Sequence, residues 1–559
     1  MILTSFAEIF SIGAVLPFLG VLTAPNRVFE HPAAQSFIQI LEITSPEQLL
    51  LPLTIIFGLA ALTAGAMRLL LLWADIRLSF ATGADLSISI YRRTLYQPYA
   101  VHIARNSSEI INGISTKTGT VIHVIVMLLN LVSSSVMLSA IMIALLSFEP
   151  IIALTAFGGF GLIYAFIIWL TRSRLMINGQ LVARESSYVI KSLQEGLGGI
   201  RDVLIAGSQL TYLKIYRDAD QPLRRAQGNN LFISQSPRNG MEALGMVLFA
   251  ALAYTLARQS EGIANAIPVL GALALGAQRL LPVLQQAYAA LTAIRGEQSS
   301  LQDTLELLDQ PLPDYANQPP AEPIPFRKQI SLRRLSFRYS PQTPWVLKNV
   351  DCTILKGDRV GFIGTTGSGK STLLDIIMGL LKPTEGALEI DGLPITTCNQ
   401  RAWQTHIAHV PQAIFLTDNT IEENIAFGEP KDQINHERVR QAARQAQIAD
   451  IIESWPEQYQ TLVGERGIRL SGGQRQRIGI ARALYRQADV IIFDEATSAL
   501  DNETEQAVMQ AINNLGEDLT ILIIAHRLTT LKNCTQIVEL SDGCIKRTGT
   551  YQNIVNQNA

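Results

Sequence analysis

The segment GTTGSGKS, residues 364–371, has the residue types and spacing of a phosphate-binding loop. Its glycines let backbone N–H groups approach phosphate closely, Lys370 can reach the β and γ oxygens, and the Ser371 hydroxyl can ligate magnesium at the positive end of a helix. The chemistry needs a strand before the loop and a helix after it. The sequence predicts both, a strand over 358–363 and a helix over 371–381. The expected nucleotide-binding residues are Gly364, Thr365, Thr366, Gly367, Ser368, Gly369, Lys370, Ser371 and Thr372.

Two carboxylates close the apolar run VIIFDE, residues 490–495. The carboxyl end of a parallel strand is where α/β folds place chemistry. There Asp494 would hold magnesium through water, and Glu495 would polarise the attacking water. The alternative is a pair that only caps the next helix. Taken alone, His526 after TILIIA is an ordinary strand-terminal histidine, and Gln412 in HVPQ is an ordinary loop amide.

The stretch LSGGQ, residues 470–474, begins a second glycine-bearing helix. Its first N–H groups and the Ser471 hydroxyl can bind a phosphate anion. The loop at 364–371 already surrounds one side of a triphosphate, so we expect this second site to serve another copy of the chain. The alternative is a helix-capping turn that binds no ligand.

The order of these motifs indicates a family. Residues 330–559 resemble the nucleotide-binding domain of ATP-binding cassette (ABC) transporters, in which a phosphate loop, a glutamine loop, the LSGGQ signature, a carboxylate strand, an inter-site loop and a switch histidine follow one another. The resemblance implies a magnesium-dependent ATPase with C-terminal α/β architecture. It also implies a homodimer in which two ATP molecules are held between the subunits.

The resemblance also implies roles for single residues. Tyr339 in SFRYS would stack on adenine, and Asp501 in SALD would lie in the inter-site loop. The signature of one subunit would close over ATP on the phosphate loop of its partner. The implied catalytic residues are Glu495, His526 and Gln412, the magnesium ligands are Ser371, Gln412 and Asp494, and the signature residues are Leu470, Ser471, Gly472, Gly473 and Gln474.

The composition places another part of the chain in lipid. The 559 residues exceed one core and predict at least two domains. Only 16% of them are charged, 48% are hydrophobic, and the mean hydropathy is +0.22. A net charge of −2 lacks the basic field of a nucleic-acid-binding protein. Six helical spans are expected in an all-α membrane domain over 1–308, at about 6–22, 49–73, 121–147, 151–170, 241–257 and 263–281.

Basic residues gather between the second and third spans and between the fourth and fifth, which predicts that these segments and both termini are cytoplasmic. Few helix breakers interrupt the two segments, so we expect them to extend the spans as helices that turn near 99–108 and 207–218. The proline-rich run 309–326 predicts a linker, and 327–559 is the expected nucleotide-binding domain. The membrane half resembles the ABC exporter fold. It departs from that fold before the first span, where exporters usually carry a basic helix, and this leaves open a truncated or misassigned start.

The cargo is indicated by arginines inside apolar segments. Arg68 and Arg279 are expensive in hydrocarbon, which makes them candidates to bind an anionic head group in a wet cavity. The alternatives are snorkelling or pairing with Glu242 or Asp75. Spans one and six resemble lipid-linked oligosaccharide flippases. We therefore expect a bacterial inner-membrane exporter or flippase for an amphipathic glycolipid or polysaccharide precursor. The alternatives are a multidrug or lipid exporter, a non-transporting ATP-gated regulator, and a heterodimer with a related chain.

Overall fold

The computed structural model describes residues 43–148, 150–257, 263–319, 321–495, 502–513, 518–525 and 531–555, with scattered positions between 3 and 39. Packing divides the chain into two compact units. The helical unit comprises Met1–Gln97 and Ala104–Pro313, and the sheet unit comprises Pro98–Ile103 and Asp314–Ala559. Each unit is built around its own apolar contacts.

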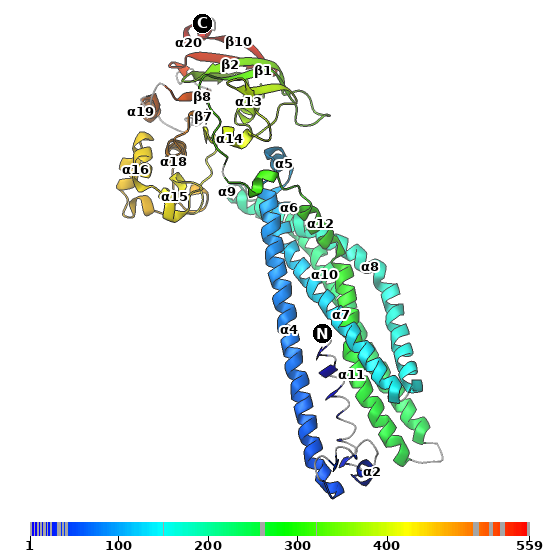
Figure 1. Cartoon of the computed structure of the whole chain (residues 1–559). Coiled ribbons are helices and arrows are strands. Elements are labelled where there is room, and N and C mark those ends of the chain that lie inside the picture. The colour runs from blue at the N-terminus through cyan, green and yellow to red at the C-terminus, as the bar shows by residue number, and fades with distance from the viewer. Residues whose placement is uncertain are drawn as a thin grey trace. The chain divides into compact units, whose positions relative to one another are not determined.

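The helical unit consists of very long helices joined by short turns (Figure 1). The long helices continue through internal glycines, such as Gly58 in α4 and Gly179 in α8, and α10 continues through its two internal prolines. A π-helical turn, η2, separates α6 from α7. The elements are α2 (Pro25–Phe29), η1 (Pro46–Leu49), α4 (Leu50–Leu95), α6 (Ser107–Asn112), η2 (Gly113–Lys117), α7 (Thr118–Phe148), α8 (Pro150–Gly198), α9 (Ile200–Ile205), α10 (Gln209–Ala257), α11 (Ile263–Gly296) and α12 (Gln298–Leu308).

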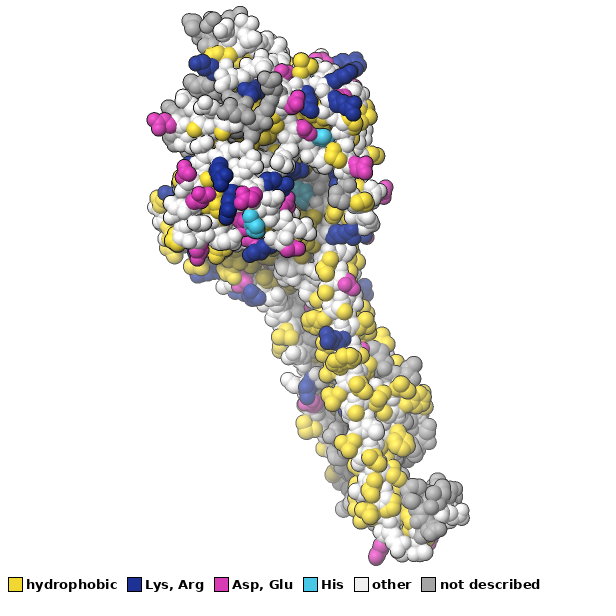
Figure 2. Space-filling view, turned by 60° about the vertical axis from the view of Figure 1, so that its left-hand side comes forward, with side chains coloured by type: hydrophobic (Ala, Val, Ile, Leu, Met, Phe, Trp, Pro, Cys, Tyr) yellow, Lys and Arg dark blue, Asp and Glu magenta, His cyan; other side chains and the backbone are white. Residues whose placement is uncertain are grey.

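Three helical stretches among the described residues are long and apolar enough to cross a membrane: Pro46–Leu95, Ser107–Ile143 and Gly158–Gly198. They overlap the expected spans at 49–73, 121–147 and 151–170. The expected spans at 241–257 and 263–281 are helical, inside α10 and α11, whereas most of 6–22 lies outside the described residues. Many hydrophobic side chains and few charged ones lie along the coloured surface of the long helices, whereas most charged side chains in this view lie on the sheet unit (Figure 2).

Close contacts and buried polar pairs fix how the long helices cross. A Cβ added at Gly179 on α8 would lie 2.4 Å from the carbonyl oxygen of Gly296, so the backbones meet there. Asn112, fully buried on α6, donates to the Ser186 and Ser187 hydroxyls of α8 at 3.0 and 2.9 Å. The Lys117 ammonium of η2 pairs with the Asp303 carboxylate of α12. Apolar helix surfaces alone could pack in many registers, and these polar contacts favour the one register in which the buried polar groups are paired.

The two expected cytoplasmic turns are present, but the second lies earlier than expected. The first contains α5 (Tyr99–Ala104), between α4 and α6. The second runs over 199–208, around α9, whereas the sequence indicated 207–218. Gly207 has a φ of +62° and ends the turn, after which α10 begins at Gln209. Residues 209–218 contain no breaker, which is why they join the long helix.

The sheet unit contains two sheets. One is antiparallel, in the order β2-β1-β4-β5, and the other has the order β10-β9-β3-β8-β7-β6. In the second sheet every pairing is parallel except that of β9 with β10. The strands are β1 (Gln329–Phe337), β2 (Leu347–Leu355), β3 (Arg359–Ile363), β4 (Glu385–Ile390), β5 (Leu393–Pro394), β6 (Ile407–Val410), β7 (Val490–Asp494), β8 (Thr520–Ile524), β9 (Gln536–Ser541) and β10 (Cys544–Gly549).

Helices complete the sheet unit in two groups. The first, α13 (Lys370–Ile377) with α14 (Gln400–Gln404), packs in the core that both sheets share. There the fully buried Trp403 donates its Nε1–H to the Ile377 carbonyl at 2.7 Å. The second group forms a separate apolar cluster against the opposite face of the mainly parallel sheet. Its elements are α15 (Ile421–Ile425), α16 (His436–Gln445), α17 (Ala449–Glu453) and α18 (Gly472–Tyr485). Two further helices and four short turns complete the described part of the unit: α19 (Asn502–Asn513), α20 (Tyr551–Val555), η3 (Asp314–Asn317), η4 (Lys431–Gln433), η5 (Gln458–Gln460) and η6 (Glu465–Gly467).

Candidate functional site

The glycine-rich loop joins β3 to α13 and is shaped by backbone conformations that favour glycine. Gly364, Gly367 and Gly369 have φ values of +147°, +84° and +97°. A Cβ added at Gly364 would lie 2.2 Å from the Leu540 carbonyl oxygen and 2.8 Å from the Ser368 hydroxyl. Any side chain at this position would therefore push the loop out of its curve. The strand, loop and helix lie where the sequence predicted them, within one residue at the start of each element.

Lys370 and Ser368 lie under the loop and fit an anion. The Lys370 ammonium is buried and donates to the Gly364 and Thr365 carbonyls at 2.9 and 3.0 Å. The Ser368 hydroxyl is also buried and has no hydrogen-bond partner among the described residues. A buried donor without a partner is costly, and a phosphate oxygen would satisfy it. Thr365, Thr366 and Ser371 face solvent at the mouth of this cradle.

Three of the predicted site residues meet at the ends of neighbouring strands: the expected magnesium ligand Asp494 and the expected catalytic residues Glu495 and Gln412. Asp494 ends β7, where it pairs with Ile524 of β8. Glu495 follows with a φ of +51°, a strained conformation for a residue other than glycine, and its N–H donates to the Ile524 carbonyl at 3.2 Å. The Gln412 side chain, just beyond β6, donates to the Glu495 carboxylate at 2.8 Å. The parallel pairing of β6, β7 and β8 brings these chain segments to one edge.

Electrostatics link the carboxylates to the phosphate loop. Burial raises the pKa of Asp494, the Glu495 carboxylate raises it further, and the Lys370 ammonium lowers it. Asp375 on α13 was not singled out by the sequence. Burial and the nearby Asp494 carboxylate raise its pKa to about 6. No motif marks position 375, so only the packing of α13 against β7 could have identified it.

Tyr339 lies beside the same helix. Its hydroxyl is 3.2 Å from the Thr372 hydroxyl, and its ring stands edge-on to Phe337 with the ring centroids 5.0 Å apart. The side chain remains 51% exposed, which leaves a ring face open to a planar ligand. This geometry is compatible with the adenine-stacking role that the resemblance implies.

The signature opens α18 with a reciprocal cap. The Ser471 hydroxyl accepts the Gln474 N–H at 3.2 Å, and the Gln474 side chain accepts the Ser471 N–H at 2.8 Å. Ser471 is exposed and Leu470 is buried beneath it. Sequence reasoning favoured ligand binding by Gln474 and gave a helix-capping turn only as the alternative, although the S-x-x-Q spacing is a signal of such a cap. The cap orients the first N–H groups of a long helix toward solvent.

Four expected site residues are not brought together by the described structure. Asp501 and His526 lie outside the described residues. Arg68 lies on α4, within an apolar stretch, and its side chain is exposed in the single chain. Arg279 lies on α11, where only the backbone is described.

Comparisons with known proteins point to ABC transporters. Residues 347–498 match the family model described as "ABC transporter". An ATP-dependent lipid A-core flippase of Alkalilimnicola ehrlichii is 32% identical over 367 residues, which cover 65% of this chain and 62% of the relative. The flippase of the same name from Cupriavidus metallidurans is 27% identical over 84% of this chain and 79% of its own length. ATP-binding cassette sub-family B member 5 of Mus musculus is 39% identical over 44% of this chain and 20% of its own length.

A solved structure covers almost the entire fold. It is a bacterial Atm1-family ABC exporter with ATP bound, and it matches 98% of this chain and 96% of its own with a TM-score of 0.78 at 24% identity. The alignment with the Alkalilimnicola relative spans less than two thirds of that relative's length. The sheet unit contains an ABC transporter ATPase domain. The whole chain has the ABC exporter fold.

Proposed function

We propose that the chain is one half of a homodimeric, ATP-driven exporter or flippase in a bacterial inner membrane, with the ATPase domain in the cytoplasm. The supporting observation is that one chain combines a preformed phosphate cradle with apolar helices of membrane-crossing length. Nucleotide binding at the cradle could then drive movement of the membrane-spanning helices of the same chain.

The chain's own residues divide the work of ATP hydrolysis in this proposal. Lys370 and the loop N–H groups bind the phosphates, and Tyr339 stacks on adenine. Glu495 orients and polarises the attacking water, while Gln412 and His526 contact the γ-phosphate side. The Gln412–Glu495 hydrogen bond at 2.8 Å supports this, because it places the amide beside the carboxylate that would receive water.

Magnesium fits the oxygen donors at this edge. Ser371, Gln412 and Asp494 supply a hydroxyl, an amide and a carboxylate, the hard ligands that Mg²⁺ takes together with phosphates and waters. No group of three His, Cys, Asp or Glu side chains forms a metal site within the described residues, so the ion would rely on the nucleotide for its remaining ligands. When bound, the ion would neutralise charge that develops on the phosphates.

Dimerisation follows from the exposed signature. Ser471 and the first N–H groups of α18 form an anion site, and each subunit's own cradle already encloses one side of the triphosphate. Two copies arranged head to tail would each complete the other's site. Loss of the γ-phosphate removes charge that both helix starts bind, so the dimer loosens after hydrolysis.

The proposed cargo is a lipid-linked saccharide or glycolipid with an anionic head group. The names of the two flippase relatives support this class. Arg68 within the apolar α4 and Arg279 on α11 are the candidate head-group ligands, because a guanidinium binds phosphate through paired N–H donors.

Reconstitution tests the proposal. The full chain in liposomes should hydrolyse ATP, and a phosphorylated glycolipid should stimulate hydrolysis and cross the bilayer more than plain phospholipid does. The double variant Arg68→Gln/Arg279→Gln should lose the glycolipid stimulation while nucleotide affinity is kept. Equal stimulation by uncharged amphipaths would indicate a multidrug exporter instead. Hydrolysis without any transported lipid would indicate an ATP-gated regulator.

A second measurement tests dimerisation. Light scattering of the Glu495→Gln variant should report a dimer of the 61.3 kDa chain with MgATP. If this variant binds MgATP but stays monomeric, and the wild-type chain hydrolyses ATP at full rate as a monomer, the shared site is contradicted.

A further inference from the structure

An arginine near the C-terminal end of the signature helix binds the chain segment that follows Gln412. Arg482 on α18 donates its Nε–H to the Asn424 carbonyl at 2.9 Å and one Nη to the Phe415 carbonyl at 3.0 Å. Its guanidinium also lies 4.5 Å from the centroid of the Phe427 ring. Burial lowers the pKa of this guanidinium to about 10, so it remains charged at neutral pH.

Asn424 extends this contact along the segment. The side chain is fully buried, and its oxygen accepts the Thr417 N–H at 3.0 Å. Its amide donates to the Thr417 and Thr420 carbonyls, each at 3.0 Å. Arg482 thus binds a residue that is itself bonded to both ends of the turn at 417–420. Hydrogen bonds from a charged donor are stronger than neutral ones, so we expect Arg482 to hold this segment firmly against α18.

Close packing adds contacts on both sides of Phe415. A Cβ added at Gly479 on α18 would lie 2.5 Å from the Ile414 Cδ1, and one added at Gly467 in η6 would lie 2.7 Å from the Leu416 Cδ1. Residues 414, 415 and 416 are therefore each held by α18 or by the turn that precedes it. Glycine at 479 is the reason that the segment can approach the helix backbone.

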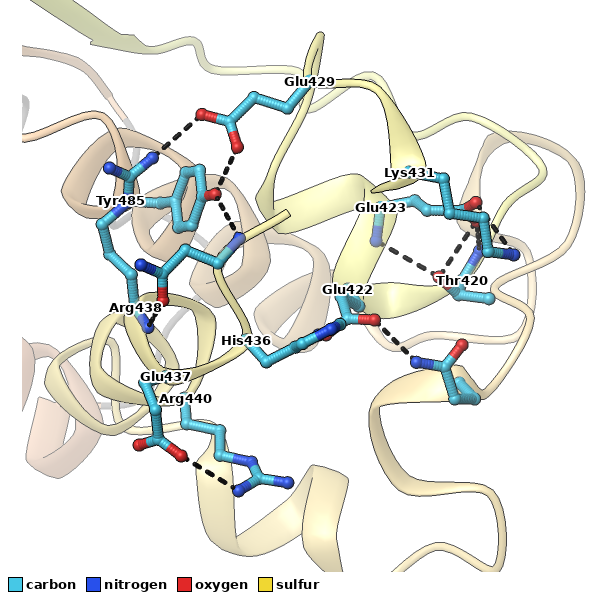
Figure 3. A network of polar contacts seen from close by, with 12 residues as sticks. Thr420, Glu422, Glu423, Glu429, Lys431, His436, Glu437, Arg438, Arg440 and Tyr485 are labelled. Carbon is cyan, nitrogen blue, oxygen red and sulfur yellow. Dashed lines mark hydrogen bonds and ion pairs between the residues drawn. The ribbon is translucent and has the colours of Figure 1, made fainter. Parts of the chain in front are cut away.

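The far end of α18 is joined to its neighbours by a second network (Figure 3). Tyr485 donates its hydroxyl hydrogen to the Glu429 carboxylate and accepts the Asn435 N–H at 3.2 Å. Arg438 of α16 pairs with Glu429 at 2.9 Å and lies 3.9 Å from the Tyr485 ring centroid. The signature helix therefore packs against α16 and the loop that follows α15, and it also contacts α15; we call α15, α16 and α18 the helical body.

We propose that Arg482 is a positioning residue that makes residues 413–417 part of this body, so that Gln412 and the signature start at Ser471 move together when nucleotide binds. Gln412 stands at the phosphate edge of the site and Ser471 at the surface that meets a partner. A change at the first would reach the second through the contacts of Ile414, Phe415 and Leu416. The inference deepens the proposed function and rests on it.

Hydrogen exchange of the full chain in nanodiscs tests whether Arg482 couples Gln412 to the signature start. The parent is Glu495→Gln, which should hold MgATP without turning it over. MgATP should slow exchange both in the phosphate loop, 364–372, and in the signature start, 471–478. Arg482→Lys should keep the first protection and lose at least half of the second, because a lysine cannot hold the carbonyls of Phe415 and Asn424 in one fixed fork. The affinity for a fluorescent ATP analogue should change less than threefold.

A matched control and a second variant guard against misfolding. Arg486 follows the same helix, is exposed, and donates to the Gln404 carbonyl at 3.1 Å, so Arg486→Lys should behave like the parent. Gly479→Ala should weaken the signature response by pushing Ile414 away, and Gly479→Ala/Ile414→Ala should restore it. These two variants test the contact between α18 and residues 414–416 without changing a charge.

The outcomes are separable. Protection of 471–478 that is equal in the Arg482→Lys and Arg486→Lys proteins overturns the inference. Loss of ATP binding together with loss of the signature response also overturns it, because Arg482 would then support only the fold. If the Glu495→Gln parent itself binds no MgATP, the proposed function fails first and the inference falls with it.

Discussion

Replacing Asp375 with asparagine should stabilise the ATPase domain at neutral pH. The carboxyl is partly buried on α13 near Asp494, and burial together with that neighbouring charge raises its pKa from 3.8 to about 6. Between those pH values the folded protein binds a proton that the unfolded chain has released. The stability that this carboxyl contributes is therefore complete below pH 3.8 and is lost as the pH rises through 6. An asparagine side chain has the same shape but does not ionise, so the Asp375→Asn protein keeps this stability at neutral pH.

The size of the gain follows from the same pKa difference. A rise from 3.8 to about 6 corresponds to about 3 kcal/mol if the group were fully shielded. Asp375 is only half-buried, and solvent screening reduces the expected gain to about 1 kcal/mol. For a domain of this size that is a rise in Tm of about 2–4 °C. About half of the gain should remain at pH 5, near the middle of the titration.

Thermal unfolding followed by tryptophan fluorescence measures the effect, since Trp345, Trp403 and Trp455 all lie in the sheet unit. The scans should be made without nucleotide and with a chelator at pH 5 and pH 7.5. Asp432→Asn, at an exposed carboxylate of the same unit, is the control. A Tm for Asp375→Asn that equals or falls below the wild-type value at pH 7.5 would refute the reasoning.

Three other substitutions have defined outcomes. Gly364→Ala should weaken binding of a fluorescent ATP analogue at least tenfold, about 1.4 kcal/mol, because the new Cβ would lie 2.2 Å from the Leu540 carbonyl; an unchanged Kd contradicts this. Trp403→Phe should cost about 1–3 kcal/mol in denaturant unfolding, since the buried Ile377 carbonyl loses its 2.7 Å donor; no shift in midpoint would mean that the bond contributes nothing. Burial acts to raise the pKa of Asp391, but N–H donors from 327–329 and the charge of Lys328 together lower it. Asp391→Asn should therefore lower the Tm near pH 7, with a difference that shrinks as the pH falls below 4; a constant difference would exclude this linkage.

Much of the nucleotide site could be predicted because its parts are local. The phosphate loop is a strand, a glycine turn and a helix within about twenty residues, so spacing alone specifies where N–H groups and Lys370 lie. Asp494 and Glu495 could be singled out for the same reason, since a short apolar strand that ends in two carboxylates is a local pattern, although spacing alone left open a pair that only caps the next helix. The Ser471–Gln474 cap was also readable from spacing, although it was interpreted as ligand binding.

Other features depend on contacts between distant residues. The 2.8 Å bond between Gln412 and Glu495 joins positions 83 apart in the chain, and it exists because β6 and β7 are neighbours in the parallel sheet. No sequence signal marks Asp375 or Arg482, because burial and a neighbour's charge, rather than spacing, determine their properties. The second turn between the long helices was placed late because a single glycine does not show whether it begins or ends a turn.

The sequence by itself therefore determined the chemistry and the class of this protein: which residues could bind a triphosphate, which could activate water, and which segments are apolar enough for lipid. These properties depend on residue type over short distances. Only the tertiary structure decided which strands are neighbours, which carboxyl groups lie close enough to perturb one another, and which segment Arg482 holds. Those outcomes depend on how apolar faces pack across the whole chain, and local spacing contains no record of that packing.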